Sequence, residues 1–338
     1  MSIKNSASPD KTKIQVILSV DTEEEWDWSG PFPEQNPDVT NIQELPAFQA
    51  FCRNVGIRTT YFVDYAVVNC PDSVNILKEL MQVGDIEIGA HLHPWVNPPF
   101  FGITDEPRSH VVNLPIGQVE QKLSELTQKL GDTFGHKPQS FRTGRWGING
   151  DILNLLIQQG YRFDSSVYPH YKNEYFDCSS AVTLPYWPSL QKSDLQDKTG
   201  TQRSILEIPV STGFNRDAFR FCNNIHSTFT KFPFSTLRLN GILWHTHILR
   251  KLYLSPEICT ADEMITLAQK LLDKGQRVFH LYLHSSSLLD NATEMAAAVN
   301  AREQITQRIE LFLDYLAQHC EIEFKTVSEA GQNWIDHD

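Results

Sequence analysis

The chain has 338 residues and a formal net charge of -12, with 41% hydrophobic and 21% charged residues. These fractions are those of an ordinary globular protein, and the length permits one large α/β domain as readily as two smaller ones. The negative charge argues against a nucleic-acid surface, which needs a basic patch, and gives no support to binding at an anionic membrane surface.

Several features of the sequence bear on its location. The segment 1–12 contains no apolar stretch, so we expect no secretory signal there and predict a disordered tail. No segment approaches the ~18 uninterrupted apolar residues that a transmembrane helix needs. The cysteines are scattered, without a Cys-x-x-Cys pair, which favours reduced structural thiols and a cytoplasmic protein.

Strand-like and helical patterns alternate along residues 13–330. Parallel strands joined by crossover helices are the expected result, and the number of strands predicts a single domain built as a distorted (β/α)7-type barrel. Two patternless segments, 94–115 and 165–203, are predicted to be long functional loops. In chain order, the predicted strands are 13–20, 57–65, 85–93, 140–142, 161–166, 204–210, 276–284 and 321–327, and the predicted helices are 42–56, 72–84, 118–131, 149–160, 261–275 and 294–318.

An acidic cluster follows the first predicted strand. Because side chains alternate between the two faces of a strand, Asp21 and Glu23 are predicted to point to the same side. Glu24 and Glu25 are then expected to meet solvent or an arginine. Catalytic residues lie at the carboxyl ends of strands in α/β barrels, so a functional site is favoured here over a solvated acidic turn.

Two histidines end the third strand, in the stretch "GAHLHPW". His91 and His93 stand two residues apart and are expected to share a face, which is a common arrangement for a metal pair. The alternative is two unrelated histidines with local hydrogen bonds. Pro94 stops the strand directly after them, which places both at its end.

Two arginines and two further histidines complete the strand ends. Arg142 and Arg145 follow the fourth strand, where an arginine would offset repulsion among the carboxylates; the alternative is a surface ion pair. His284 ends the strand 276–284, where an acid or base can act, whereas His280 lies deeper and is expected in the core. Together, the polar residues at these strand ends suit metal-assisted hydrolysis.

These motifs resemble those of the polysaccharide deacetylase family, also called carbohydrate esterase family 4 or the NodB-homology domain. The resemblance runs from Lys13 to about Val327 and rests on the order and spacing of the motifs. They are "LSVDTEE", "RTTYFV", "EIGAHLHPW", "SFRTGRWG", "GYRFDSSVYP" with "EIPVS", and "LYLHSSS".

The resemblance implies a distorted barrel, a divalent metal cofactor, commonly zinc, and hydrolysis of an amide by activated water. By position, it implies Asp21 as the base, Glu23 as the metal carboxylate, His91 as the first histidine ligand, Arg142 as the residue that orients the base, and His284 as the acid.

Two departures from the family pattern concern the metal. The family's Asp-Asp pair is replaced by "DTEE", so the carboxylate ligand is either Glu23 or Glu24, and Glu23 is preferred because it shares a face with Asp21. The second metal histidine of the family lies four residues after the first, and Trp95 occupies that position here. His93 is the nearby substitute, so the metal site is either rearranged or lost.

The expected substrate is an N-acylated sugar or glycan precursor, from which an acyl group, most simply acetyl, is removed. Trp26, Trp95, Arg145 and Tyr168 are predicted to bind it. Two alternatives stay open: a non-catalytic carbohydrate-binding or scaffold protein on the same barrel, and a deformylase or amidase for a non-polymeric amide. The second His-x-His, at His245, lies outside the motifs and is predicted to have a loop or core role.

Overall fold

The computed structural model describes residues 11–26, 30–229, 239–293, 297 and 299–337. Residues 1–10 of the predicted tail and the start of the helix predicted at 294–318 lie outside the described residues. No helix within the described ranges is long and apolar enough to cross a membrane.

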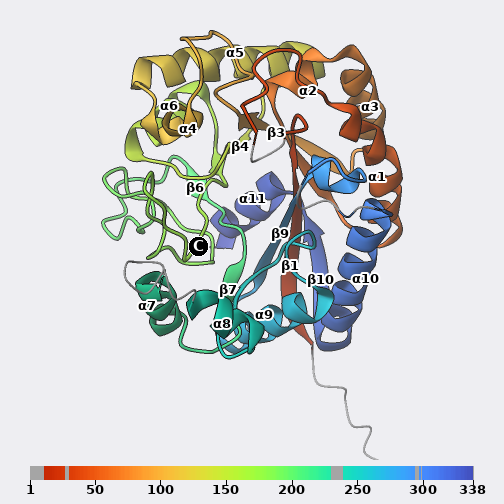
Figure 1. Cartoon of the computed structure of the whole chain (residues 1–338), viewed down its shortest axis with the longest axis vertical. Helices are drawn as coiled ribbons and strands as arrows, with labels where there is room; N and C mark the ends of the chain where they lie inside the picture. The colour runs from red at the N-terminus through yellow and green to blue at the C-terminus, as the bar shows by residue number, and fades with distance from the viewer. Residues whose placement is uncertain (1–10, 27–29, 230–238, 294–296, 298, 338) are drawn as a thin grey trace, which may run out of the picture.

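A curled parallel sheet forms the centre of the molecule (Figure 1). Strand β1 pairs with β9 along one edge, and with β10 and then β2 along the other; β3 to β6 continue from β2. This confirms the predicted distorted barrel. The strands of this sheet are β1 (Thr12–Thr22), β2 (Thr59–Val63), β3 (Ile86–Leu92), β4 (Ser140–Thr143), β5 (Phe163–Asp164), β6 (Leu206–Glu207), β9 (Val278–His284) and β10 (Cys320–Lys325).

Helices cover the outside of the sheet, and a short antiparallel hairpin, β7 (Thr212–Phe214) with β8 (Lys251–Tyr253), is added beside it. The helices are α1 (Leu45–Asn54), α2 (Tyr65–Asn69), α3 (Pro71–Met81), α4 (Glu106–Ser109), α5 (Ile116–Phe134), α6 (Gly150–Gln159), α7 (Phe219–Phe229), α8 (Leu239–His245), α9 (Ala261–Asp273), α10 (Ala301–His319) and α11 (Val327–His337), with 3-10 turns η1 (Thr40–Glu44), η2 (Val111–Asn113) and η4 (Ser285–Leu288).

Local sequence explains where the crossover helices begin and end. Thr260 and Glu263 form a reciprocal capping box at the start of α9. Asn149 caps the start of α6, and Gly160 ends it with a left-handed backbone (φ 92°). Such signals are local, which is why the alternation of strands and helices was predictable.

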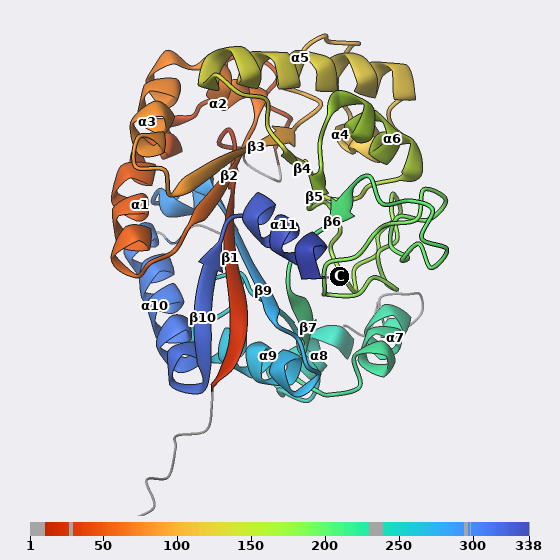
Figure 2. The ribbon, with the colours of Figure 1, turned by 180° about the vertical axis from the view of Figure 1, so that it is seen from behind.

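Helix α11 closes one end of the barrel (Figure 2). Val327 and Ala330 belong to a buried apolar cluster with Phe163 on β5 and Ile208, which directly follows β6. The backbone N–H of Val327 donates to Thr60 Oγ1, 2.9 Å away, near the start of β2. The amino ends of the strands are therefore covered, and the carboxyl ends remain for a site.

Candidate active site

Strand register gathers the polar residues at the carboxyl ends. Asp21 on β1 lies directly beside His284 on β9. His91 on β3 lies directly beside Arg142 on β4. Since β2 separates β1 from β3, the two pairs face each other across the curl of the sheet, as expected for parallel strands.

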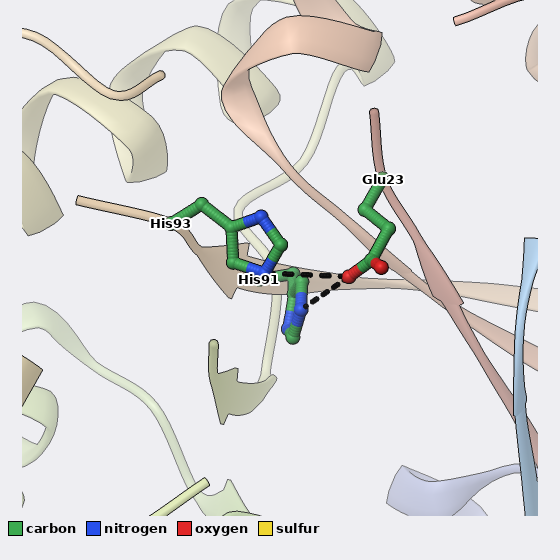
Figure 3. A group of neighbouring side chains, drawn as sticks. All are labelled: Glu23, His91 and His93. Atoms are coloured by element: carbon green, nitrogen blue, oxygen red, sulfur yellow. Dashed lines mark hydrogen bonds and ion pairs between the residues drawn. The ribbon is translucent and has the colours of Figure 1, made fainter. Parts of the chain in front are cut away.

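A carboxylate and two imidazoles converge at this end (Figure 3). Glu23 Oε2 lies 3.2 Å from His91 Nε2 and 3.3 Å from His93 Nε2. All three side chains are buried, and their atoms form a group able to hold a metal ion. A tetrahedral ion at about 2.0–2.1 Å from each ligand separates its ligands by about 3.3 Å, so the donor atoms and spacing fit a zinc-like cation.

The other ring nitrogen of each histidine is also occupied. His91 Nδ1 lies 3.1 Å from the carbonyl oxygen of Arg142, and His93 Nδ1 lies 3.1 Å from Glu24 Oε1. Both acceptors can only receive a proton, so each Nδ1 donates. A metal ion beside Glu23 would meet the lone pair of each Nε2 when Nδ1 carries the only ring proton, which is the tautomer a metal-binding histidine needs; Nε2 of His91 also lies within hydrogen-bond distance of Glu23 Oε2, at 3.2 Å.

Asp21 is held as an anion. Arg142 Nη1 donates to Asp21 Oδ1 over 2.5 Å, and the guanidinium also donates to the Ser165 carbonyl and hydroxyl. Burial raises the pKa of Asp21, but the positive charges of Arg142, His91 and His284 outweigh it, so the pKa lies below its usual value. An ionised, buried carboxylate at this position is suited to accept a proton.

His284 has the opposite protonation state. Its Nε2 lies 3.9 Å from Asp21 Oδ2, and its Nδ1 donates to Glu257 Oε1 over 2.8 Å. Burial lowers the pKa of the imidazole, but the carboxylates of Glu257, Glu23 and Asp21 outweigh it and raise the pKa to about 10. A charged imidazolium therefore stands beside an ionised aspartate.

Glu257 was missed by the sequence reasoning. It precedes α9 in the segment "SPEICT" and binds both the ring and the backbone N–H of His284. Nothing local in that segment signals a functional carboxylate, because the contact joins a loop residue to the end of strand β9. His280, in contrast, is buried with Nε2 2.9 Å from Ser19 Oγ, as a core histidine.

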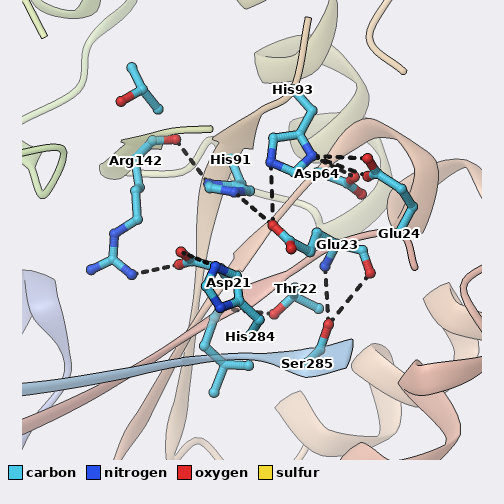
Figure 4. A network of polar contacts seen from close by, with 12 residues as sticks. Asp21, Thr22, Glu23, Glu24, Asp64, His91, His93, Arg142, His284 and Ser285 are labelled. Atoms are coloured by element: carbon cyan, nitrogen blue, oxygen red, sulfur yellow. Dashed lines mark hydrogen bonds and ion pairs between the residues drawn. The ribbon is translucent and has the colours of Figure 1, made fainter. Parts of the chain in front are cut away.

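The expectation that Glu24 meets solvent or an arginine is wrong. Glu24 is 1% exposed and contacts His93 (Figure 4). Burial raises its pKa, but the charge of His93 and hydrogen bonds outweigh it and lower the pKa to about 2. Burial and the Glu24 carboxylate raise the pKa of the neighbouring Asp64 well above its usual value.

A cavity of about 400 Å³ opens above these groups. Its lining includes all four predicted substrate-binding residues, Trp26, Trp95, Arg145 and Tyr168. Arg145 Nη1 donates to Glu106 Oε2 over 2.7 Å, and its guanidinium lies 5.4 Å from the Trp26 ring. Tyr168 stacks on Trp146 at 4.7 Å.

Trp95 differs from the other three. It borders the cavity but is 0% exposed, and its indole N–H donates to Glu24. Trp95 thus contacts a residue of the site directly, and its predicted role in substrate binding stays a prediction. His245 is exposed at the end of α8 and belongs to neither group of potential metal ligands in the described chain.

No family model matches the sequence, and no curated protein matches it. Solved structures do match. A proposed polysaccharide deacetylase from Mycobacterium smegmatis is 14% identical, with a TM-score of 0.56 over 98% of this chain and 93% of that one. A proposed glycoside hydrolase/deacetylase from Parabacteroides distasonis is 12% identical, with a TM-score of 0.62 over 97% of this chain and 72% of that one. The Puue allantoinase is 16% identical, with a TM-score of 0.53 over 97% of this chain and 92% of that one.

These similarities define the class of fold, a distorted (β/α) barrel with its polar groups at the carboxyl ends of the strands. The chain has the fold of the polysaccharide deacetylases, as the sequence resemblance implied.

Proposed function

We propose that the protein is a metal-dependent hydrolase that removes an acyl group, most simply acetyl, from an N-acylated sugar or glycan precursor. The observation that carries this proposal is the meeting of two sets of residues at one cavity. Glu23, His91 and His93 form a metal-ligand group, and the Asp21–His284 pair lies beside it with opposite charges.

Glu23, His91 and His93 would hold the metal, and their one oxygen and two nitrogen donors favour zinc among divalent ions. A bound divalent ion supplies Lewis acidity, which activates water and stabilises the charge that develops on the amide oxygen. The proposed ligands are of the family's types, one carboxylate and two histidines. The spacing differs, because His93 replaces a second histidine that lies four residues after the first in the family.

The remaining chemistry falls to the chain's own acid and base. Asp21, fixed by Arg142, accepts the proton of the attacking water. His284, protonated and held by Glu257, donates a proton to the leaving nitrogen as the carbon–nitrogen bond breaks. Nε2 of His284 and Oδ2 of Asp21 are 3.9 Å apart, so one amide bound in the cavity could contact both groups.

The cavity wall suits a sugar. Trp26, Trp146, Tyr168 and Tyr175 present aromatic rings to the same space, and aromatic faces pack against the apolar faces of sugar rings. Arg145 and Glu106 add a charged pair that can bind hydroxyl groups.

A small, non-polymeric amide is the second candidate. The likeness to the Puue allantoinase favours it, since allantoin is a small cyclic molecule with amide-type bonds. A cavity of about 400 Å³ has room for a molecule of that size. The acid, base and metal ligands would serve either substrate, so the substrate panel decides between them.

Amine release from a panel of N-acetylated sugars, N-formylated sugars and small amides tests the proposal. We expect hydrolysis of at least one N-acyl sugar by the zinc-loaded protein, and a loss of about 10²–10⁴-fold in kcat for Asp21→Asn. Asp132→Asn, an exposed control on α5, keeps full activity. Absence of hydrolysis across the panel would favour a non-catalytic binding protein.

A further inference from the structure

We propose that Glu24 and Trp95 form a positioning pair for the metal ligand His93. Glu24 fixes the orientation and tautomer of the imidazole, and Trp95 fixes Glu24. The inference rests on the proposed function, because it concerns the same metal group. It gives a role to the tryptophan that stands at the position of the family's second metal histidine.

The contact between Glu24 and His93 is direct and buried (Figure 4). Nδ1 of His93 lies 3.1 Å from Oε1 and 3.2 Å from Oε2 of the carboxylate. Glu24 is 1% exposed and His93 is 4% exposed, so water does not compete for this hydrogen bond. A buried, charge-assisted bond of this kind fixes the orientation of a ring.

Trp95 holds the same carboxylate oxygen as His93. Its indole N–H donates to Oε1 of Glu24, and its ring stacks on the His93 ring at 4.2 Å with an angle of 27°. One side chain thus supports the ligand twice, through the carboxylate and through the ring face.

The turn after β4 approaches the His93 ring at its Cδ2 atom. A Cβ at Gly144 would lie 2.0 Å from His93 Cδ2. The imidazole is therefore limited by Trp95 at one face and by Gly144 at Cδ2, and its bond to Glu24 favours the rotation that points Nε2 at Glu23.

The two histidine ligands are supported in different ways. His91 Nδ1 donates to a backbone carbonyl, that of Arg142, which no side-chain substitution removes. His93 Nδ1 depends on Glu24. A substitution at Glu24 should therefore weaken one ligand and leave the other in place.

Glu24, Asp64 and His93 also form a second group that could hold a cation. The hydrogen bonds argue for a supporting role instead. Both the Trp95 indole and His93 Nδ1 direct an N–H at Glu24, and a cation bound there would have to displace these donors. We therefore expect one metal ion per chain.

Zinc affinity of the folded protein, measured by competition with a chromogenic chelator, tests the proposal without an activity assay. We expect Glu24→Gln to weaken zinc binding about 10–100-fold. Trp95→Phe keeps the ring but loses the N–H, and should weaken binding in the same direction by less. Glu25→Gln is the matched control, because that carboxylate accepts from the Asn41 backbone; its zinc affinity should equal that of the wild type.

A proton NMR spectrum of the zinc-loaded protein provides the second readout. The wild type should show a downfield Nδ1–H resonance of His93 that is shifted or lost in Glu24→Gln, which a merely structural role would not require. Unchanged zinc affinity and an unchanged resonance in Glu24→Gln would overturn the positioning role, as would two zinc ions per wild-type chain. A wild type that binds no zinc would instead overturn the proposed function.

Discussion

Asp21 and His284 are neighbouring residues on paired strands, and their environments separate their proton affinities. Arg142 donates to Asp21, whereas Glu257 accepts from His284. The pKa of Asp21 is lowered, and that of His284 is raised to about 10. Two groups whose pKa values are moved apart in this way provide a base and an acid in the same pH range.

Glu257→Gln tests the acid. His284 is active when protonated, so activity is present below its pKa and is lost as pH rises through it. Removal of the Glu257 charge lowers that pKa, and the alkaline loss of activity should move to lower pH. The measurement is the pH profile of kcat/KM, with the exposed Glu120→Gln as control. An alkaline limb in the same position as in the wild type would contradict the assignment.

At the scale of residues, strand alternation predicted one position beyond the strand and missed another. Asp21 on β1 and Glu23 just after it were predicted to point to the same side, and both line the cavity. The same reasoning failed at Glu24, because β1 ends at Thr22 and alternation is not enforced beyond a strand. Glu257 was not predictable, since its partner lies on a different element and no local pattern marks it.

At the scale of elements, the turn after β4 shapes the metal group. The backbone N–H of Gly144 donates to the Leu92 carbonyl over 3.0 Å, which draws the turn against the end of β3. The sequence shows a glycine here. It does not show that His93 packs against this glycine, because that contact depends on how β3 and β4 pair.

Gly144→Ala should displace His93, since the added Cβ would lie 2.0 Å from the ring. We expect zinc affinity to fall by at least about 10-fold, and the free energy of unfolding to fall by about 1–3 kcal/mol from overpacking. Isothermal titration with zinc and urea unfolding measure the two effects. Gly117→Ala, where no atom lies within 4 Å of the new Cβ, is the control. Wild-type affinity in Gly144→Ala would show that the ring is not confined there.

At the scale of the whole molecule, the two ends of the barrel differ. Helix α11 packs on the amino ends of the strands, and the candidate site lies at their carboxyl ends. The order of strands and helices was predictable because each is marked by local apolar patterns and caps. The extent of the later strands was not: the segments 161–166 and 204–210 contain strands of only two residues each, β5 and β6. Their pairing is set by the curl of the sheet and not by their own sequence.

Gly331→Ala tests the closed end. Its added Cβ would lie 2.4 Å from Phe163 Cδ1 and 2.8 Å from Ile208 Cδ1, so α11 would have to shift. We expect the free energy of unfolding to fall by about 1–3 kcal/mol, measured by urea denaturation, while the zinc affinity of the folded protein stays unchanged. A loss of zinc affinity as large as that of Gly144→Ala would show that the two ends are coupled.

The central claim is that Glu23, His91 and His93 bind a catalytic metal ion. Its most direct test is the zinc content of the folded protein after equilibration with zinc and removal of the excess, for the wild type and for the His91→Ala/His93→Ala double variant. His136→Ala, at an exposed position after α5, is the control. We predict about one zinc per chain in the wild type and the control, and none in the folded double variant. A zinc-free wild type, or a double variant with the same zinc content, would contradict the account.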